Sequence, residues 1–210
     1  MYGKRLEAVT RTARILWVAF LVAAVAYLPL GLVVRSAAAP PSAPEPLVAI
    51  ALAAAAFIDA VLSFVLPAQI FRNAVRARGL AVAEEIDPAA MPGAYRDQAA
   101  KRRVLKEPAK VELAAAAVGL TTFIMEGAMR EAVVLFGFVL LFLGHAPVIW
   151  GPFFAVGWIL LALAWPSPRA WLRRVERVYD ARLATSAEPS GGGQRPSDAT
   201  NEAAGASAGR

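Results

Sequence analysis

The sequence predicts an all-α fold, an integral membrane four-helix bundle with short interfacial helices on its cytoplasmic side. Composition is the first observation behind this prediction. The 210 residues are 58% hydrophobic and 18% charged, whereas an average soluble domain is about 25% charged. The second observation is that the hydrophobic residues gather in four separate runs. Each run is long enough for a helix that crosses a bilayer, which takes roughly 17–25 residues.

The predicted spans follow the four apolar runs in order. They are residues 15–34, 47–71, 111–143 and 148–165. The first and the fourth contain no charged residue, whereas the second and the third do. A helix over the third run would measure roughly 50 Å, against about 30 Å of hydrocarbon. We therefore expect the Ala-rich start of this run to project beyond the membrane surface.

The first run follows a short basic segment, residues 1–14, and this order also fits a cleaved secretory signal peptide. Small residues at positions 36–39 could serve as the cleavage site. However, the apolar stretch is 20 residues long, and the apolar region of a signal peptide has roughly 7–15. An uncleaved membrane anchor is therefore the favoured interpretation.

The basic residues predict the orientation of the bundle. Of the 22 Lys and Arg residues, four lie before the first span, nine lie within 72–110 and seven follow the fourth span. Because cytoplasmic loops are enriched in Lys and Arg, we predict a multi-pass protein of the bacterial inner (plasma) membrane with both termini in the cytoplasm. The net charge of +6 then indicates contact with anionic lipid head groups and not with nucleic acid.

Segments outside the spans are also expected to form helices. Residues 73–86 can continue the second span, and the basic segment 94–106 is compatible with a surface helix. Residues 166–183 carry apolar side chains at helical spacing and are expected to form an amphipathic helix in the lipid interface. The residues expected to contact the interface are Arg169, Trp171, Arg173, Arg174 and Arg177. Residues 184–210 are rich in Ser, Gly, Pro and Ala, which is typical of disorder.

Four charged residues fall inside the predicted spans: Asp59, Glu126, Arg130 and Glu131. A charge at the bilayer centre costs roughly 2.5–3.5 kcal/mol on insertion scales, so these side chains should face the bundle interior. Glu126 and Arg130 are four residues apart and can pair along one helix face. We expect Asp59 to pair with Arg130 across two helices, and Glu131 to need another partner, water or protonation. The cluster is then either an ion-pair network that fixes helix register or a relay for protons or ions.

Residues 128–139, with the sequence AMREAVVLFGFV, resemble two kinds of membrane protein. One is the proteolipid (c-ring) subunit of rotary ATPases, and that resemblance implies that Glu131 matches the ion-carrying carboxylate. The chain departs from that family in its basic 72–110 loop and its C-terminal tail. The other resemblance is to uncharacterised small four-helix bacterial inner-membrane proteins, which implies a fold but no activity.

Several classes of site are excluded by composition. The chain has no Cys and one His, His145, which excludes thiol nucleophiles, Cys-based zinc sites and multi-His metal sites. No hydrolase, nucleotide-binding or zinc-protease motif occurs, and we expect His145 to be a solvated loop residue. We therefore predict a non-enzymatic membrane protein without cofactor or metal, which acts through assembly with its own copies or with a membrane protein partner. The alternative is a small transporter or ion-coupled subunit that uses the intramembrane carboxylates.

Overall fold

The computed structural model describes residues 3–37, 45–86 and 101–184, and most of these residues are helical, as predicted. The helices are α1 (Lys4–Ala37), α2 (Pro46–Arg76), α3 (Pro108–Phe142), α4 (Pro147–Ala162) and α5 (Pro168–Tyr179). The strands are β1 (Val82–Ile86), β2 (Lys101–Leu105) and β3 (Arg182–Leu183). The tail that the sequence predicts to be disordered lies, beyond Ala184, outside the described residues.

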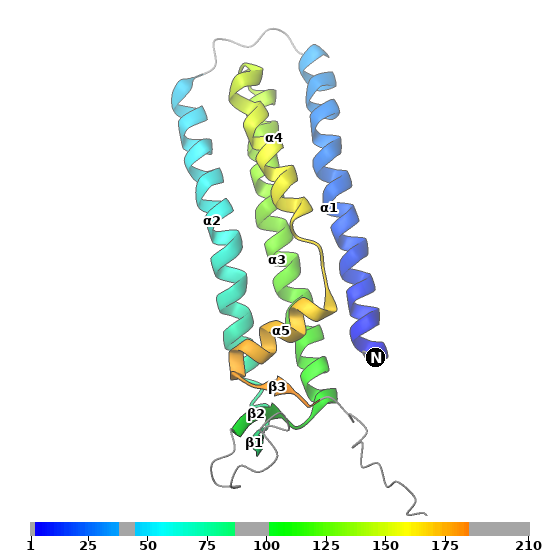
Figure 1. The fold of residues 1–210 in the computed structure, drawn as a ribbon. Helices are drawn as coiled ribbons and strands as arrows, with labels where there is room; N and C mark the ends of the chain where they lie inside the picture. Colours follow the sequence, from blue (N-terminus) through cyan, green and yellow to red (C-terminus); the bar gives the residue numbers. More distant parts are fainter. Residues whose placement is uncertain (1–2, 38–44, 87–100, 185–210) are drawn as a thin grey trace, which may run out of the picture.

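Helix α3 is the central helix of the bundle. Helices α1, α2 and α4 all pack on it, and α1 also packs on α4 (Figure 1). The long helices α1 and α2 accompany most of its length, whereas the shorter α4 lies beside the half that is far from the strands. The start of α1, the end of α2 and the start of α3 therefore meet at one end of the bundle, which we call the strand end.

Three glycines of α3 let aromatic rings from three other helices approach its backbone. The pairs are Gly119 with Trp171 of α5, Gly127 with Phe20 of α1, and Gly137 with Phe154 of α4. In each pair, a Cβ atom on the glycine would lie within 3.1 Å of the ring, which is closer than van der Waals contact. Small residues on α3 are therefore what permits this close helix packing.

A hydrophobic core surrounds the start of α3 at the strand end. It joins residues of α1, α2, β2, α3 and α5: Leu6, Phe71, Leu105, Val111, Ala115, Trp171 and Val175, each at most 4% exposed. The sequence predicted that this part of α3 would project beyond the membrane surface. In the structure, neighbouring elements cover it, so the strand end has a core of its own.

The apolar face of α5 packs on protein. Its buried residues are Trp171, Leu172 and Val175. The sequence predicted that Trp171 contacts the lipid interface, and the structure corrects this because the ring fills the space beside Gly119. At the end of α5, the phenol of Tyr179 accepts a hydrogen bond from the Leu80 N–H (3.1 Å) and donates one to the Val75 carbonyl (2.9 Å). These bonds tie α5 to the end of α2.

Residues 82–86 and 101–105 are strands, although the sequence predicted helix over 73–86 and 94–106. Helix α2 ends at Arg76, and Gly79 then turns the chain with φ = 57°, a conformation that glycine adopts at no steric cost. Strands β1 and β2 follow in place of helix. Residues 87–100, which include the start of the second predicted helix, lie outside the described residues.

The strands form one small sheet in the order β1-β2-β3. Strands β1 and β2 pair antiparallel, and β2 pairs in parallel with β3. The register places Glu84 opposite Arg103 and Glu85 opposite Arg102. Opposite charges that face each other across two strands stabilise the pairing. This tertiary pairing outweighs the helix propensity of the separate segments.

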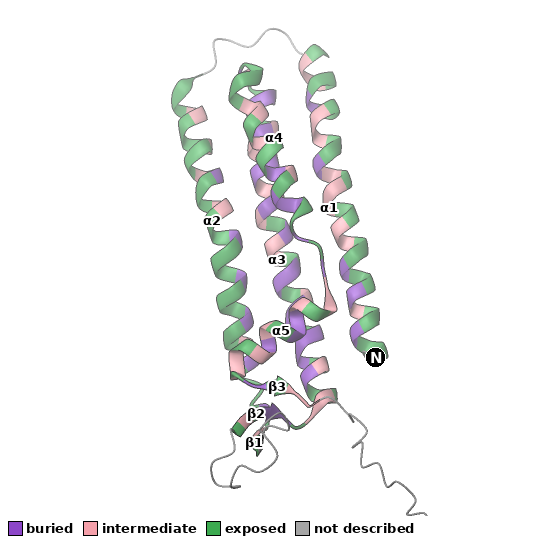
Figure 2. Ribbon diagram, viewed as in Figure 1, coloured by how far each residue is buried: buried purple, intermediate pink, exposed green. Residues whose placement is uncertain are grey.

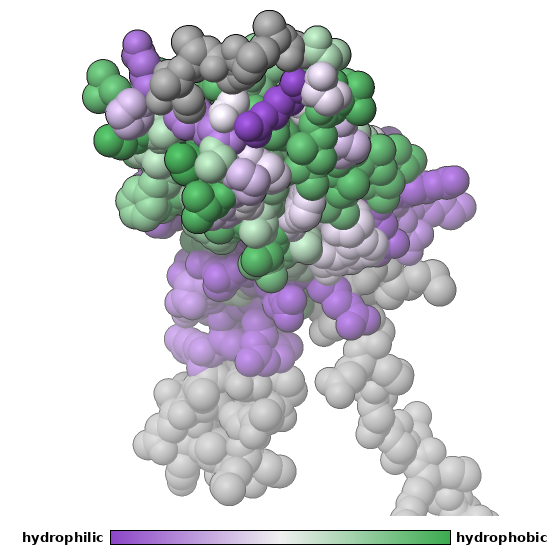
Figure 3. All heavy atoms as spheres, turned by 90° about the horizontal axis from the view of Figure 1, so that it is seen from above, coloured by the Kyte–Doolittle hydropathy of each residue, from purple (hydrophilic) through white to green (hydrophobic). Residues whose placement is uncertain are grey.

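Large hydrophobic side chains are exposed on the outside of the bundle. Among the described helices, α1 and α2 are long and apolar enough to cross a membrane, and α4 is a shorter apolar helix. Only 11% of the residues in the most apolar stretch of α1, and of α2, are buried. Figure 2 shows the exposed residues along α2 and the buried ones along α3, and Figure 3 shows many hydrophobic side chains on the face seen from above.

Candidate functional site

Arg130 is the best-enclosed charge of the bundle interior. The residue is 3% exposed, and its guanidinium forms an ion pair with Glu126 at 2.5 Å. It also donates a hydrogen bond to the backbone carbonyl of Leu160 in α4 (2.8 Å) and lies over the Phe64 ring of α2, 4.9 Å from the ring centre. The pair that the sequence predicted along one face of α3 is therefore present, and three helices enclose it.

Asp59 does not join this cluster. The sequence predicted an ion pair between Asp59 and Arg130, but the residue of α2 that faces Arg130 is Phe64. Five residues separate Asp59 from Phe64, so their side chains point about 140° apart around the helix. Within the part of the chain that the structure describes, Asp59 has no ion pair, and the predicted pair is absent.

Glu131 faces α1. The phenol of Tyr27 in α1 donates a hydrogen bond of 2.8 Å to its carboxylate, and both residues are half-buried. Arg130, the neighbouring residue on α3, instead contacts α2 and α4. The four charges predicted inside the spans therefore lie in three different environments and do not form one network.

Arg35 lies at the other end of the bundle, away from the strands. It donates hydrogen bonds to the backbone carbonyls of His145 (3.0 Å) and Gly144 (3.3 Å). These carbonyls follow the C-terminus of α3, where helices leave carbonyls without intrahelical partners. His145, which the sequence predicted to be solvated, is 2% exposed. This correction follows from the contact with α1, which closes over the turn between α3 and α4.

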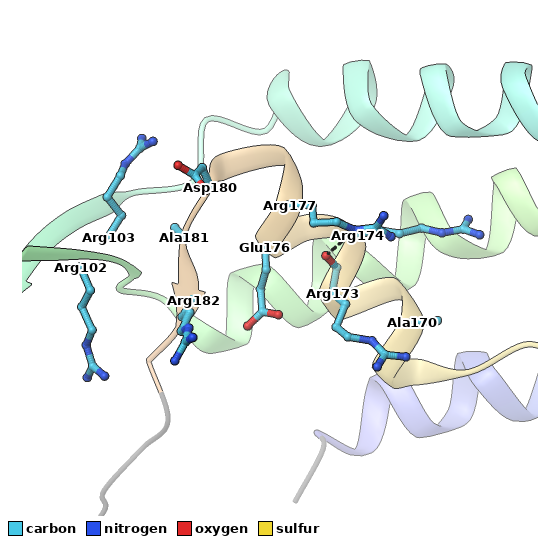
Figure 4. Close-up of a pocket in the computed structure, with 10 residues that line it drawn as sticks. All are labelled: Arg102, Arg103, Ala170, Arg173, Arg174, Glu176, Arg177, Asp180, Ala181 and Arg182. Carbon is cyan, nitrogen blue, oxygen red and sulfur yellow. Dashed lines mark hydrogen bonds between the residues drawn. The ribbon is translucent and has the colours of Figure 1, made fainter. Parts of the chain in front are cut away.

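The strand end carries a hollow of about 690 Å³ between α5 and the sheet (Figure 4). Six arginines line it: Arg102, Arg103, Arg173, Arg174, Arg177 and Arg182. Two carboxylates also line it, those of Asp180 and of Glu176, and Glu176 accepts a hydrogen bond from the Leu183 N–H (3.0 Å). Positive charge prevails, so this surface attracts anions.

A second hollow, of about 620 Å³, lies between α2 and α5. We call it the α2–α5 groove, and its charged lining residues are Arg72, Arg76, Arg174 and Arg177. No carboxylate is among the described residues that line it, and Val65 and Ala68 of α2 supply apolar surface. Figure 4 shows Arg174 and Arg177 extending from α5 away from the strands. The two arginines thus line both hollows.

Two tryptophans and an arginine meet where the bundle passes into the strand end. Arg14 lies over the ring of Trp165, 5.5 Å from its centre, and Trp165 packs edge-on against Trp17 at 4.8 Å. Arg169, predicted to contact the lipid interface, lines a third hollow together with Arg14 and Arg11. Trp residues beside basic residues are typical of a membrane–water boundary.

The sequence did not single out two arginines of these hollows, Arg72 and Arg76, which lie just beyond an apolar run. It assigned Arg102 and Arg103 to a surface helix and Arg182 to the interfacial helix, and it did not place these arginines together. No local motif joins them, because they come from distant parts of the chain that only the fold brings together.

The comparisons with known proteins give no information on the function of this chain. No protein-family model, curated protein or solved structure matches the chain, so the two resemblances of residues 128–139 stay predictions. Among residues 3–37, 45–86 and 101–184, no group of three His, Asp or Glu side chains could hold a metal ion. Any proposal of function therefore rests on exposure, charge and packing.

Proposed function

We propose that the chain is a four-span integral protein of the bacterial inner membrane, with both termini and the small sheet in the cytoplasm. Its role is binding and assembly without catalysis: the arginine-lined strand end engages anionic groups at the membrane surface. The observation that carries this proposal is a belt of exposed apolar side chains that ends at arginines.

The apolar belt consists of the exposed hydrophobic residues of α1, α2, α3 and α4. On α1 it runs from Ile15 to Val33, which spans roughly 27 Å and is close to the ~30 Å of hydrocarbon in a bilayer. At the strand end, arginines border the belt. Arg14 directly precedes Ile15 in α1, and Arg72 lies two residues after Ile70 in α2. An exposed apolar surface that extends over four helices is unfavourable in water. Burial of this surface in lipid would explain why these side chains are exposed on the protein.

The distribution of arginines supports a cytoplasmic strand end. The arginines of the two hollows all lie there, and cytoplasmic surfaces of membrane proteins are enriched in Lys and Arg. At the opposite end, Arg35 is bound to the carbonyls of Gly144 and His145. Arg35 is thus an exception by position, but its guanidinium is used in hydrogen bonds within the fold.

Cysteine accessibility tests the proposed topology. Because the chain has no Cys, each single-Cys variant carries one reactive thiol. In intact spheroplasts, we expect a membrane-impermeant maleimide to label Ala146→Cys, at the exposed turn before α4, and not Lys106→Cys, at the exposed residue that follows β2. Phe57→Cys, which replaces a side chain that is 71% exposed in the middle of the belt, should react only after denaturation.

Permeabilised cells provide the control for this experiment. Once the membrane is opened, Lys106→Cys should react as completely as Ala146→Cys. Labelling of Lys106→Cys in intact spheroplasts would show that the orientation is reversed. Labelling of Phe57→Cys in native membranes would contradict insertion of the belt.

The enclosure of Arg130 supports a structural role for the buried charges. A residue on an ion pathway faces a water-filled cavity or other ionisable groups along the path. Arg130 instead touches a carboxylate of its own helix, a backbone carbonyl and an aromatic ring. Such a closed pair holds α2, α3 and α4 in one arrangement.

Ion-coupled transport is the second candidate function, and Glu131 is the residue that favours it. Its half-buried carboxylate accepts a hydrogen bond from a neutral phenol, and it has no ion pair within the described residues. Asp59 is also half-buried without an ion pair there. Carboxylates that no cation neutralises are the groups that can exchange a proton inside a membrane.

Proton flux into proteoliposomes separates the two candidates. We expect the wild-type protein to pass no more protons, followed with an enclosed pH-sensitive dye, than liposomes without protein. Flux that is lost in Glu131→Gln or Asp59→Asn, and kept in Glu107→Gln at the strand end, would instead establish transport. Glu107→Gln is the matched control because it removes a carboxylate outside the belt.

A further inference from the structure

We propose that the α2–α5 groove binds the phosphate head group of an anionic phospholipid, with the lipid's acyl chain on the apolar surface of α2. This inference rests on the membrane orientation proposed above and deepens it, since it assigns one built site to the general attraction between arginines and lipid. Arg72 and Arg76 form one wall of the groove, and Arg174 and Arg177 form the other.

The charges of the groove need a counter-ion. Arg72 and Arg76 are four residues apart on α2, and Arg174 and Arg177 are three apart on α5, so each pair lies on one helix face, where like charges repel. None of the four has an ion pair with a carboxylate of the described chain. A phosphate between the two walls would accept charge-assisted hydrogen bonds from both.

The height of the groove in the bundle favours a lipid over a soluble anion. Arg72 lies just beyond Ile70, the last exposed large hydrophobic residue of α2 before the strand end. The same groove is lined by Val65 and Ala68, which lie inside the belt. One surface therefore offers arginines at head-group level and apolar side chains at acyl level, as basic pockets that bind anionic lipids do.

A path for the acyl chain continues along the same face of α2. Phe57 and Ala68 are eleven residues apart, which places them within about 20° of each other around the helix. Phe57 belongs to a wholly apolar hollow of about 200 Å³ between α2 and α4, whose far wall includes Phe153 and Val156. Helices α2 and α4 make little contact with each other, so this side of the bundle is open to lipid.

The hollow between α5 and the sheet is less suited to this ligand. It has more arginines, but Glu176 and Asp180 line it as well. None of its lining residues belongs to the apolar belt. It therefore provides the matched control, because arginines can be removed there without changing the α2–α5 groove.

Lipid binding by the full-length protein in neutral detergent tests the proposal. The probes are phosphatidylglycerol, phosphatidylcholine with the same acyl chains, and inorganic phosphate, and bound lipid is counted by native mass spectrometry. We expect phosphatidylglycerol to bind in preference to phosphatidylcholine, and inorganic phosphate at the same concentration not to displace it. The Arg72→Gln/Arg174→Gln variant should bind phosphatidylglycerol about tenfold more weakly, as loss of charged hydrogen bonds implies.

The control variant is Arg103→Gln/Arg182→Gln, which removes the same charge from the other hollow and should change binding by less than about twofold, as expected for charges outside the site. An equal loss in the two variants, or displacement by inorganic phosphate, would overturn the proposal. Gln69→Glu adds a carboxylate to the groove lining without removing an arginine, and should also weaken binding. Should the double variant misfold, unweakened binding in Gln69→Glu overturns the proposal by itself.

The experiments distinguish an error in the proposed lipid site from an error in the proposed membrane topology. If the cysteine variants label as proposed but phosphatidylglycerol shows no preference for the groove, the lipid site is wrong and the four-span topology stands. If Phe57→Cys reacts in native membranes, the topology is wrong, and the groove is no longer at head-group level.

Discussion

Replacing Arg130 with Met is expected to destabilise the folded bundle by about 3–5 kcal/mol, the cost of removing one partner of a buried ion pair. The substitution leaves the carboxylate of Glu126 without its cation and the carbonyl of Leu160 without its donor. Met is long and apolar, so packing against Phe64 is largely kept and the loss is electrostatic. The midpoint of SDS-induced unfolding, followed by tryptophan fluorescence, measures the effect.

Two further variants test whether burial is the cause. Lys110→Met breaks an exposed ion pair, in which the side chain of Lys110 is 70% exposed and that of Glu107 is 42% exposed. This variant should lose no more than about 1 kcal/mol of folding stability. The double variant Glu126→Gln/Arg130→Met should recover part of the lost stability, because it no longer buries an unpaired charge. If Arg130→Met lowers the midpoint of unfolding no more than Lys110→Met does, the buried ion pair does not hold the helices together.

A single added methyl group at Gly157 is expected to loosen the contact between α3 and α4, at a cost of about 1–3 kcal/mol for overpacking. The Cβ atom of Gly157→Ala would overlap the side chain of Val134 and lie 3.2 Å from the backbone nitrogen of Val134. Because that nitrogen is part of α3, α4 has to move away from it. A lower midpoint of unfolding is the expected readout.

Gly151→Ala is the matched control on the same helix. An added Cβ at Gly151 has no atom within 4 Å, and Ala is favoured over Gly inside a helix by roughly 0.5–1 kcal/mol. This variant should therefore be as stable as the wild type or slightly more stable. If both variants are equally destabilised, close packing at Gly157 is not the reason.

The helices could be predicted from sequence because long apolar runs leave few alternatives. Helices α1 and α3 nevertheless begin earlier than the predicted spans, at Lys4 and Pro108. Hydropathy marks where apolar surface is required, whereas backbone hydrogen bonding continues past it into polar segments. The sheet could not be predicted in this way, because β1 and β2 become strands only when the acidic residues of one meet the basic residues of the other.

The candidate site was predictable only where its contacts are local. The pair of Glu126 and Arg130 follows from a spacing of four on one helix. Contacts between helices depend on how each helix is rotated about its own axis. The spacing of residues along one helix does not show which of its faces meets a neighbouring helix. The sequence therefore predicted Asp59 as the partner of Arg130, where the structure has Phe64. The groove arginines depend on the same tertiary arrangement.

The central position of α3 has a consequence for biosynthesis. Helices α1 and α2 pack chiefly on α3 and make at most slight contact with each other. Both are translated before it, so in the proposed membrane topology each would remain in the bilayer as a separate helix until residues 108–142 have left the ribosome. A nascent chain that terminates before Pro108 would therefore present two unassembled spans to the quality-control proteases of the membrane.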